Sequence, residues 1–223
     1  APWSSSSPAI RACSAANCFS VAARRAADAL ISPCSCCVRF ADSANAFFSG
    51  GSTSYEDSYS RFRVAGGVLE MTSFRPTGWR GWRLTSRQPS RFYVEGTFNT
   101  ISCSGSDNYG LVVRAPDYSS GQGYYFGLTC DGRYALQVWT SGGVVSIEDF
   151  TKSDEIKAGA GQTNRIGLWV DGSTFKIYLN GKLVKETSSS AISASGYLGV
   201  YVASTTAPNL VVQLDRIAYW NLP

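Results

Sequence analysis

Short apolar runs that end in Asp-Gly or Asn-Gly dipeptides dominate the second half of the chain and restrict what it can fold into. The segment 123–130 is followed at once by Asp131-Gly132, and the segment 174–180 ends in Asn180-Gly181. Both runs carry the β-branched and aromatic residues that are typical of strands. Because these dipeptides favour tight turns between antiparallel strands, the two segments predict β-hairpins.

Further strands of the same kind fill the chain from residue 61 onward. Gly66-Gly67 joins the first two, 62–64 and 68–71, as a two-residue hairpin turn. The remaining strands are expected at 79–84, 92–102, 109–115, 123–130, 133–140, 144–148, 164–170, 174–180, 182–187, 196–203 and 209–220. About a dozen short strands with no helix among them predict an all-β, two-sheet antiparallel jelly-roll sandwich over residues 61–223.

Three stretches, 107–114, 123–134 and 164–182, together resemble the concanavalin A-like, laminin-G-like modules of secreted bacterial proteins. The resemblance spans roughly residues 60–223. It implies a concanavalin A-like jelly roll in which the last strand, 209–220, closes the sandwich next to the first. It implies little about activity, because this fold hosts lectins, glycosidases and inert spacer modules alike.

The first 40 residues differ from the rest and predict a Cys-rich N-terminal assembly segment. Residues 1–12 are rich in Ser, Ala and Pro, and an apolar pattern at helical spacing runs from Ser14 to Ile31 before Pro33. This pattern predicts a short amphipathic helix. Residues 41–60 are expected to be a linker or loop. The helix supplies candidate interface residues, which are Phe19, Arg24, Arg25, Leu30 and Ile31.

Seven cysteines and no histidine constrain both the chemistry and the compartment. Without histidine, the Ser-His and Cys-His forms of nucleophile activation are excluded, as are metal sites that contain His. The cysteines favour disulfides in an oxidising compartment, so the protein is expected to be secreted or on the cell surface. Because seven is odd, at least one thiol is free, modified or bonded to another chain.

A disulfide between Cys103 and Cys130 is favoured over a reactive thiol pair. If the chain is a meander there, two strand spacings of roughly 9.6 Å in total separate these positions, and the loop 104–108 must bend Cys103 inward. The other group of cysteines has no paired C-x-x-C spacing, so disulfides that staple the helix to the turn at 34–37 are favoured over a zinc site. That group is Cys13, Cys18, Cys34, Cys36 and Cys37.

Charge is uneven along the chain. Residues 1–91 hold eleven Arg and five acidic residues, whereas residues 92–223 hold nine basic and eleven acidic residues. A basic end and a mildly acidic body are one way for identical subunits to attract one another head to tail. No apolar run approaches the roughly 20 residues that a membrane helix needs.

The acidic residues do not form the pattern of a glycosidase. Glycosidases of this fold resemble one another in a strand motif Glu-x-Asp-x-x-Glu, which is missing here. The pairs Glu148-Asp149 and Asp154-Glu155 are adjacent, so in a strand their side chains would point to opposite faces. Glu70, Glu95 and Asp215 are strand acids without an obvious partner. The chain is therefore expected not to be an enzyme.

Aromatic residues near the strand ends could hold a sugar, and ordinary sandwich packing is the alternative explanation for them. In the segment 79–84, Arg80, Trp82 and Leu84 share one face of a strand, and one face is expected to be core. This run of Arg and Trp fits a sugar or protein surface better than a nucleic-acid partner. The candidate glycan-binding residues are Trp79, Trp82, Tyr118 and Tyr124.

No cofactor is expected from the sequence, although a bound calcium ion remains an alternative. Asp107, Asn108 and Asp117 offer oxygen ligands, although no dense Asp-x-Asp series accompanies them. Three functions follow, in order of preference. The first is a non-catalytic extracellular structural protein that assembles with copies of itself, as a filament or surface-layer subunit, through its N-terminal segment. The second is a secreted carbohydrate-binding adhesion module, with cell-surface or matrix glycans as partners, and the third is a glycoside hydrolase.

Overall fold

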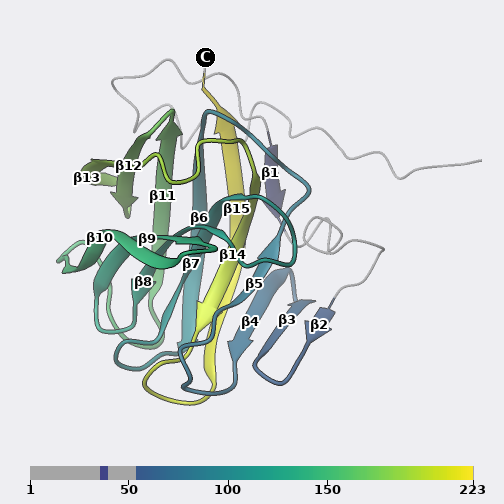
Figure 1. Ribbon diagram of the computed structural model, residues 1–223. Coiled ribbons are helices and arrows are strands. Elements are labelled where there is room, and N and C mark those ends of the chain that lie inside the picture. The colour runs from purple at the N-terminus through teal and green to yellow at the C-terminus, as the bar shows by residue number, and fades with distance from the viewer. Residues whose placement is uncertain (1–35, 40–53, 223) are drawn as a thin grey trace, which may run out of the picture.

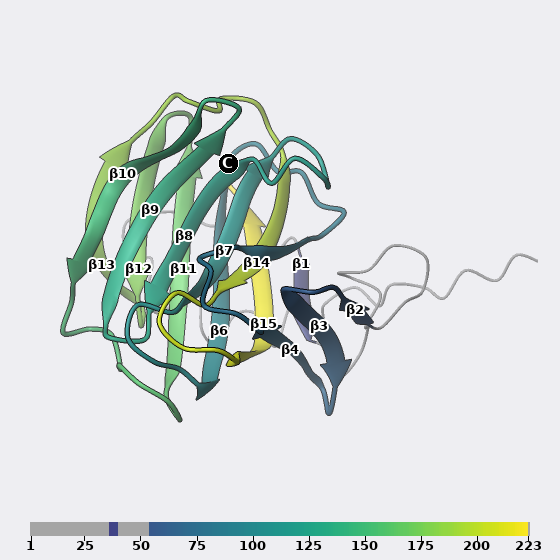
Figure 2. The ribbon, with the colours of Figure 1, turned by 60° about the horizontal axis from the view of Figure 1, so that its bottom comes forward.

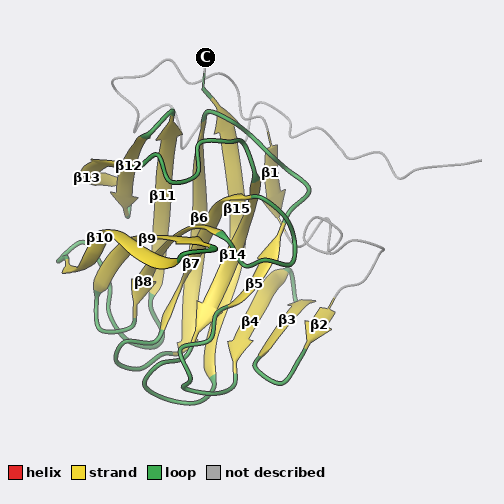
Figure 3. Ribbon diagram, viewed as in Figure 1, coloured by secondary structure: helices red, strands yellow, loops and turns green. Residues whose placement is uncertain are grey.

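The computed structural model describes residues 36–39 and 54–222, and this part of the chain contains strands and no helix (Figure 3). The prediction of an all-β fold is confirmed. In the same part of the chain, no helical segment could span a membrane. The strands are β1 (Cys36–Arg39), β2 (Ser54–Glu56), β3 (Ser60–Ala65), β4 (Val68–Ser73), β5 (Gly81–Leu84), β6 (Phe92–Ser102), β7 (Asn108–Ala115), β8 (Gly123–Thr129), β9 (Arg133–Thr140), β10 (Gly143–Lys152), β11 (Thr163–Asp171), β12 (Thr174–Leu179), β13 (Lys182–Ser188), β14 (Tyr197–Ala203) and β15 (Leu210–Asn221).

Two antiparallel sheets pack face to face (Figures 1 and 2). The nine-stranded sheet has the order β13-β12-β11-β6-β15-β4-β3-β2, and β1 pairs with β15 beside this path. The six-stranded sheet has the order β10-β9-β8-β7-β14-β5. Long strand β15 pairs with β6 along one side and with β4 and β1 on the other. The jelly-roll prediction is confirmed by this two-sheet arrangement.

The predicted hairpin turns have a clear backbone cause. Gly66 and Gly67, between β3 and β4, both have positive φ angles, 59° and 81°. A two-residue turn of this kind needs positive φ at both positions, which glycine adopts without strain. Gly132 and Gly181 also have positive φ at the turns after β8 and β12.

Part of the predicted N-terminal segment and linker belongs to the nine-stranded sheet. Strand β1 pairs with β15 through Cys36–Arg39, and β2 pairs with β3 from Ser54 onward. The predicted helix and its interface candidates, Phe19, Arg24, Arg25, Leu30 and Ile31, lie outside the described residues. So do Cys13, Cys18 and Cys34, and the structure describes only the backbone of Cys36 and Cys37.

The core lies between the sheets, and the period of two along each strand decides which side chains enter it. In β8, Tyr124, Phe126 and Leu128 belong to the core cluster, whereas Tyr125 between them does not. Both sheets contribute large side chains, and those with almost no exposed surface include Tyr109, Tyr124, Phe62, Phe92, Phe98, Phe126 and Phe175. Burial of apolar surface contributes roughly 25 cal/mol of free energy per Å². The large side chains of this core therefore supply the main stabilising contribution to the sandwich.

A disulfide joins Cys103 and Cys130, whose Cα atoms lie 5.3 Å apart. The pairing is the predicted one, but the meander geometry expected for it is wrong. Cys103 follows β6 of the nine-stranded sheet, and Cys130 follows β8 of the six-stranded sheet. The bond therefore ties the two sheets together at one end of the sandwich instead of linking alternate strands of one sheet.

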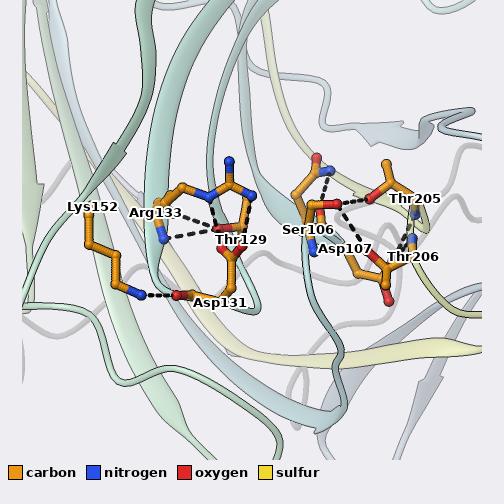
Figure 4. A network of polar contacts seen from close by, with 9 residues as sticks. Ser106, Asp107, Thr129, Asp131, Arg133, Lys152, Thr205 and Thr206 are labelled. Atoms are coloured by element: carbon orange, nitrogen blue, oxygen red, sulfur yellow. Dashed lines mark hydrogen bonds and ion pairs between the residues drawn. The ribbon is translucent and has the colours of Figure 1, made fainter.

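The same region of the fold contains a buried carboxylate that organises three loops (Figure 4). Asp107 is 1% exposed, and its Oδ1 accepts hydrogen bonds from the backbone N–H groups of Thr205, Thr206 and Ala207, at 2.7, 2.6 and 3.3 Å. Its own carbonyl accepts a hydrogen bond from the N–H of Cys130 at 2.8 Å. Asp107 thus holds the β14–β15 loop against the disulfide region.

Replacing Asp107 by alanine is expected to destabilise the fold by about 3 kcal/mol, because hydrogen bonds to a charged group are strong and their donors lose a partner. The midpoint of thermal unfolding should fall by roughly 6–12 °C. Circular dichroism melting measures this. The matched control is Asp117→Ala, which removes a carboxylate that also accepts two backbone N–H groups, from Ser119 and Ser120, in an exposed loop. An equal fall in the unfolding midpoint of the two variants would show that the contribution of Asp107 to stability does not depend on its burial.

Candidate glycan-binding surface

Aromatic side chains cover the face of the six-stranded sheet that points away from the core. Tyr125 and Tyr201 are almost fully buried there, and Trp82, Trp139 and Tyr197 are half-buried around them. They come from β8, β14, β5, β9 and β14 respectively, so four strands build the surface. We call these five residues the aromatic platform.

Small residues on the same face give the rings room to lie against the sheet. A Cβ atom added to Gly127 would overlap the hydroxyl of Tyr201, and one added to Gly121 would lie 3.1 Å from the Trp82 ring. Tyr125 meets Tyr201 edge to face, with ring centroids 5.2 Å apart, and Trp139 lies 6.1 Å away. The platform is thus packed in the way protein cores are, which fixes the orientation of each ring.

Arg80, immediately before β5, extends over the platform. Its guanidinium carbon lies 4.9 Å from the ring centroid of Tyr125, 5.7 Å from that of Tyr201 and 5.8 Å from that of Trp139. Its Nη2 donates a hydrogen bond to Oε1 of Gln137 on β9. Each cation–π contact of this kind stabilises by about 0.5–2 kcal/mol, so the rings hold the cation in a defined place.

A loop extends the surface at one end. Tyr118 lies in the β7–β8 loop, is 54% exposed, and packs on Tyr197 with ring centroids 4.4 Å apart. Its hydroxyl donates to the carbonyl of Thr85 at 3.3 Å. The hydroxyl of Tyr125 donates to the carbonyl of Gly121 at 2.6 Å, which anchors the same loop to the platform.

The hydroxyls of the two buried tyrosines, Tyr125 and Tyr201, remain protonated at physiological pH. Burial raises the pKa of Tyr201 to about 12, although the positive charge of Arg80 acts in the opposite direction. Burial also raises the pKa of Tyr125, again against the effect of Arg80. Both rings are therefore neutral, and the positive charge of Arg80 is not cancelled by a phenolate.

The structure brings two of the four predicted glycan-binding residues to this surface. Trp82 and Tyr118 lie there, and Arg80 shares the outward face with Trp82 as the alternation predicts. Tyr124 is a wrong candidate, because it is fully buried and packs in the core on Phe175, with centroids 4.7 Å apart. Trp79 is 47% exposed and packs on Tyr59, with ring centroids 5.6 Å apart. Tyr59 is not a member of the aromatic platform.

The candidate glycan-binding residues taken from the sequence do not include four members of the platform, which are Tyr125, Trp139, Tyr197 and Tyr201. A signal existed in β8, where Gly123, Tyr125 and Gly127 alternate with large core residues. Two glycines on the same face as one tyrosine indicate a face where rings lie against the backbone. Strand β7 lies between β14 and β8, and the pairing of β14 with β7 places Tyr201 beside Gly110. No local sequence pattern predicts this placement of Tyr201.

Carboxylates are scarce around the platform. Strands β5, β7, β8, β9 and β14 contain no Asp or Glu. In β10, Glu148 pairs with Lys185 of β13 at 3.1 Å. Acids on the other sheet have cationic partners that the sequence did not reveal. Glu95 lies 3.4 Å from Arg165 and 3.5 Å from Arg216.

The oxygen ligands considered for calcium do not converge. Asp107 directs Oδ1 at three backbone N–H groups, which are donors and not the surroundings of a cation. Asp117 accepts from the N–H groups of Ser119 and Ser120. Within residues 36–39 and 54–222, no group of three His, Cys, Asp or Glu side chains could hold a metal. The carboxylates of Asp107 and Asp117 are therefore both occupied by backbone donors.

No family model matches the sequence, and no curated protein resembles it. Solved structures do. The carbohydrate-binding module CBM66 from Bacillus subtilis matches with a TM-score of 0.55 and 20% identity, over 68% of this chain and 86% of that one. The fold is a concanavalin A-like jelly roll.

Two enzymes share this jelly roll. A putative glycosyl hydrolase from Parabacteroides distasonis has a TM-score of 0.52 and 13% identity, over 79% of this chain and 88% of that one. The catalytic domain of an endo-1,3-beta-glucanase from Thermotoga petrophila has a TM-score of 0.51 and 10% identity, over 75% and 82%.

These matches correct two predictions made from the sequence. The first choice, a self-assembling structural protein, is contradicted, because the similar structures are carbohydrate-binding modules and glycoside hydrolases. The prediction that the chain is not an enzyme is contradicted as well, because hydrolase domains adopt this jelly roll. Carbohydrate binding, the second choice, agrees better with these findings.

Proposed function

We propose that this protein is a secreted or cell-surface module that binds carbohydrate through the aromatic platform. The observation that carries the proposal is the set of half-buried rings of Trp82, Trp139 and Tyr197, held in place on one face of the sheet and accompanied by polar groups. Binding sites for small polar ligands combine apolar and aromatic walls with a few placed polar groups. The C–H faces of a sugar ring can stack on such rings while its hydroxyls reach Arg80 and Gln137.

Two further observations support this function. The similar structure from Bacillus subtilis is a carbohydrate-binding module. The disulfide between Cys103 and Cys130 suits an oxidising compartment, in which extracellular glycans are found.

The direct test is binding of the full chain to an array of glycans, followed by isothermal titration calorimetry with any glycan retained. We expect retention of at least one polysaccharide class. Release of reducing ends from the retained polysaccharide is measured in parallel, because hydrolase domains share the fold. An array without a signal would contradict the proposal, and release of reducing ends would extend it to hydrolysis.

A further inference from the structure

Among residues 36–39 and 54–222, Arg80 has no negatively charged partner, and this observation deepens the proposed function. Its guanidinium has five N–H donors, of which one bonds to the neutral Gln137. Its Nη1 is enclosed and has no hydrogen-bond partner among the described residues. The side chain as a whole is half-buried, so part of it remains open at the surface.

Several acids in or beside this sheet have other partners. The five strands that flank Arg80 in this sheet contain no Asp or Glu, as described above. At the sheet margins, Glu148 pairs with Lys185, and Asp131 pairs with Arg133 at 2.7 Å. Asp117 is held by backbone N–H groups of its own loop. The charge of Arg80 is therefore not neutralised within the described part of the chain.

A partly desolvated cation without a counter-ion is unfavourable unless something else offsets it. The three rings around Arg80 offset part of this cost and keep the guanidinium over the platform. Arginine pairs well with planar or tetrahedral oxyanions, because its N–H groups form a rigid fork. An anion brought by a ligand would complete this arrangement.

We infer that the ligand of the platform is an acidic glycan, whose carboxylate or sulfate ester pairs with Arg80 while a sugar ring stacks on a neighbouring aromatic residue. This inference rests on the proposed function. The inference goes beyond the proposed function because it requires a charged sugar. Stacking on aromatic rings and hydrogen bonds to sugar hydroxyls would hold a neutral sugar equally well.

The test is affinity electrophoresis of the full chain in gels that contain matched pairs of polymers. Polygalacturonate is compared with its methyl-esterified form, and dextran sulfate with dextran, so that the two pairs distinguish a carboxylate from a sulfate source. We expect at least tenfold tighter binding to the charged member of one pair. That preference should weaken as salt is added, because the ion pair lies near the surface.

Variants separate the role of Arg80 from that of net charge. Arg80→Gln should remove the preference for the charged polymer, and Arg80→Lys should keep a part of it. Arg133→Gln is the matched control, because it removes the same charge from the same sheet at a residue that already has Asp131 as its partner. Circular dichroism melting of each variant establishes that it is folded.

Equal binding to the charged and neutral polymers would overturn the inference and leave carbohydrate binding standing. An equal loss in Arg80→Gln and Arg133→Gln would also overturn it, because attraction would then depend on net charge alone. If Arg80→Gln does not fold, a preserved charge preference in Arg80→Met, which keeps much of the apolar stem, would overturn it in the same way. Failure to bind any polymer or array glycan contradicts the proposed function itself.

Discussion

Replacing Trp139 by alanine is expected to weaken glycan binding about thirtyfold, because truncating a central aromatic anchor commonly costs about 2 kcal/mol. Trp139 is half-buried beside Tyr125 and Arg80, so part of its side chain remains exposed to a ligand. Titration calorimetry of the variant with the retained glycan measures the change in dissociation constant.

The matched control for this prediction is Trp169→Ala. Trp169 is also a half-buried tryptophan in the middle of a strand, but it lies on β11, where Leu168 and Val170 on either side face the core. It therefore points away from the core on the nine-stranded sheet, opposite the platform. A similar loss of binding in both variants would contradict the placement of the site.

Removal of the disulfide by the double substitution Cys103→Ser and Cys130→Ser should destabilise the protein by about 3–4 kcal/mol, because the bond closes a loop of 27 residues in the unfolded chain. The midpoint of thermal unfolding should fall by roughly 10 °C. Differential scanning calorimetry measures the change. The double variant leaves the other five cysteines in place, which chemical reduction of the whole protein would not do.

Glycan binding provides the second measurement on this variant. The disulfide lies at an end of the sandwich, and none of the platform contacts involves Cys103 or Cys130. We therefore expect the folded double variant to bind as the natural chain does. A midpoint within about 2 °C of the original would mean that the unfolded chain is already restricted by other means.

Most of the strands could be predicted because their information is local. The turns at Gly66-Gly67, Asp131-Gly132 and Asn180-Gly181 carry residues that tolerate positive φ, and the apolar residues between them reveal the strands. The assignment of strands to sheets could not be predicted in the same way. The sequence predicts that the segments 92–102 and 123–130 belong to one meander, yet the chain crosses from one sheet to the other between β6 and β7.

The site was harder to predict than the fold for a related reason. In the run Tyr124-Tyr125-Phe126, two tyrosines of equal hydrophobicity point to opposite faces, and only the position of the second sheet decides which one is core. Tyr124 was chosen as a glycan-binding residue, and Tyr125 is the one on the platform. Arg80 and Trp82 were placed correctly on one face, but the rings that surround Arg80 come from strands that are distant in sequence.

The alternation along β8, β9 and β14 also has a consequence for how this protein can change over time. Since the half-buried residues of the platform and the core between the sheets lie on opposite sides of the same strands, ligand preference can change at residues that this core does not use. Substitutions at Trp139, Gln137 or Tyr197 can accumulate while Leu136, Val138 and Leu198 keep the sandwich intact. If the platform binds carbohydrate as proposed, a lineage could exchange one sugar for another at these positions while the core stays unchanged. A laboratory library confined to the half-buried outward positions Gln137, Trp139 and Tyr197 should yield mostly folded variants.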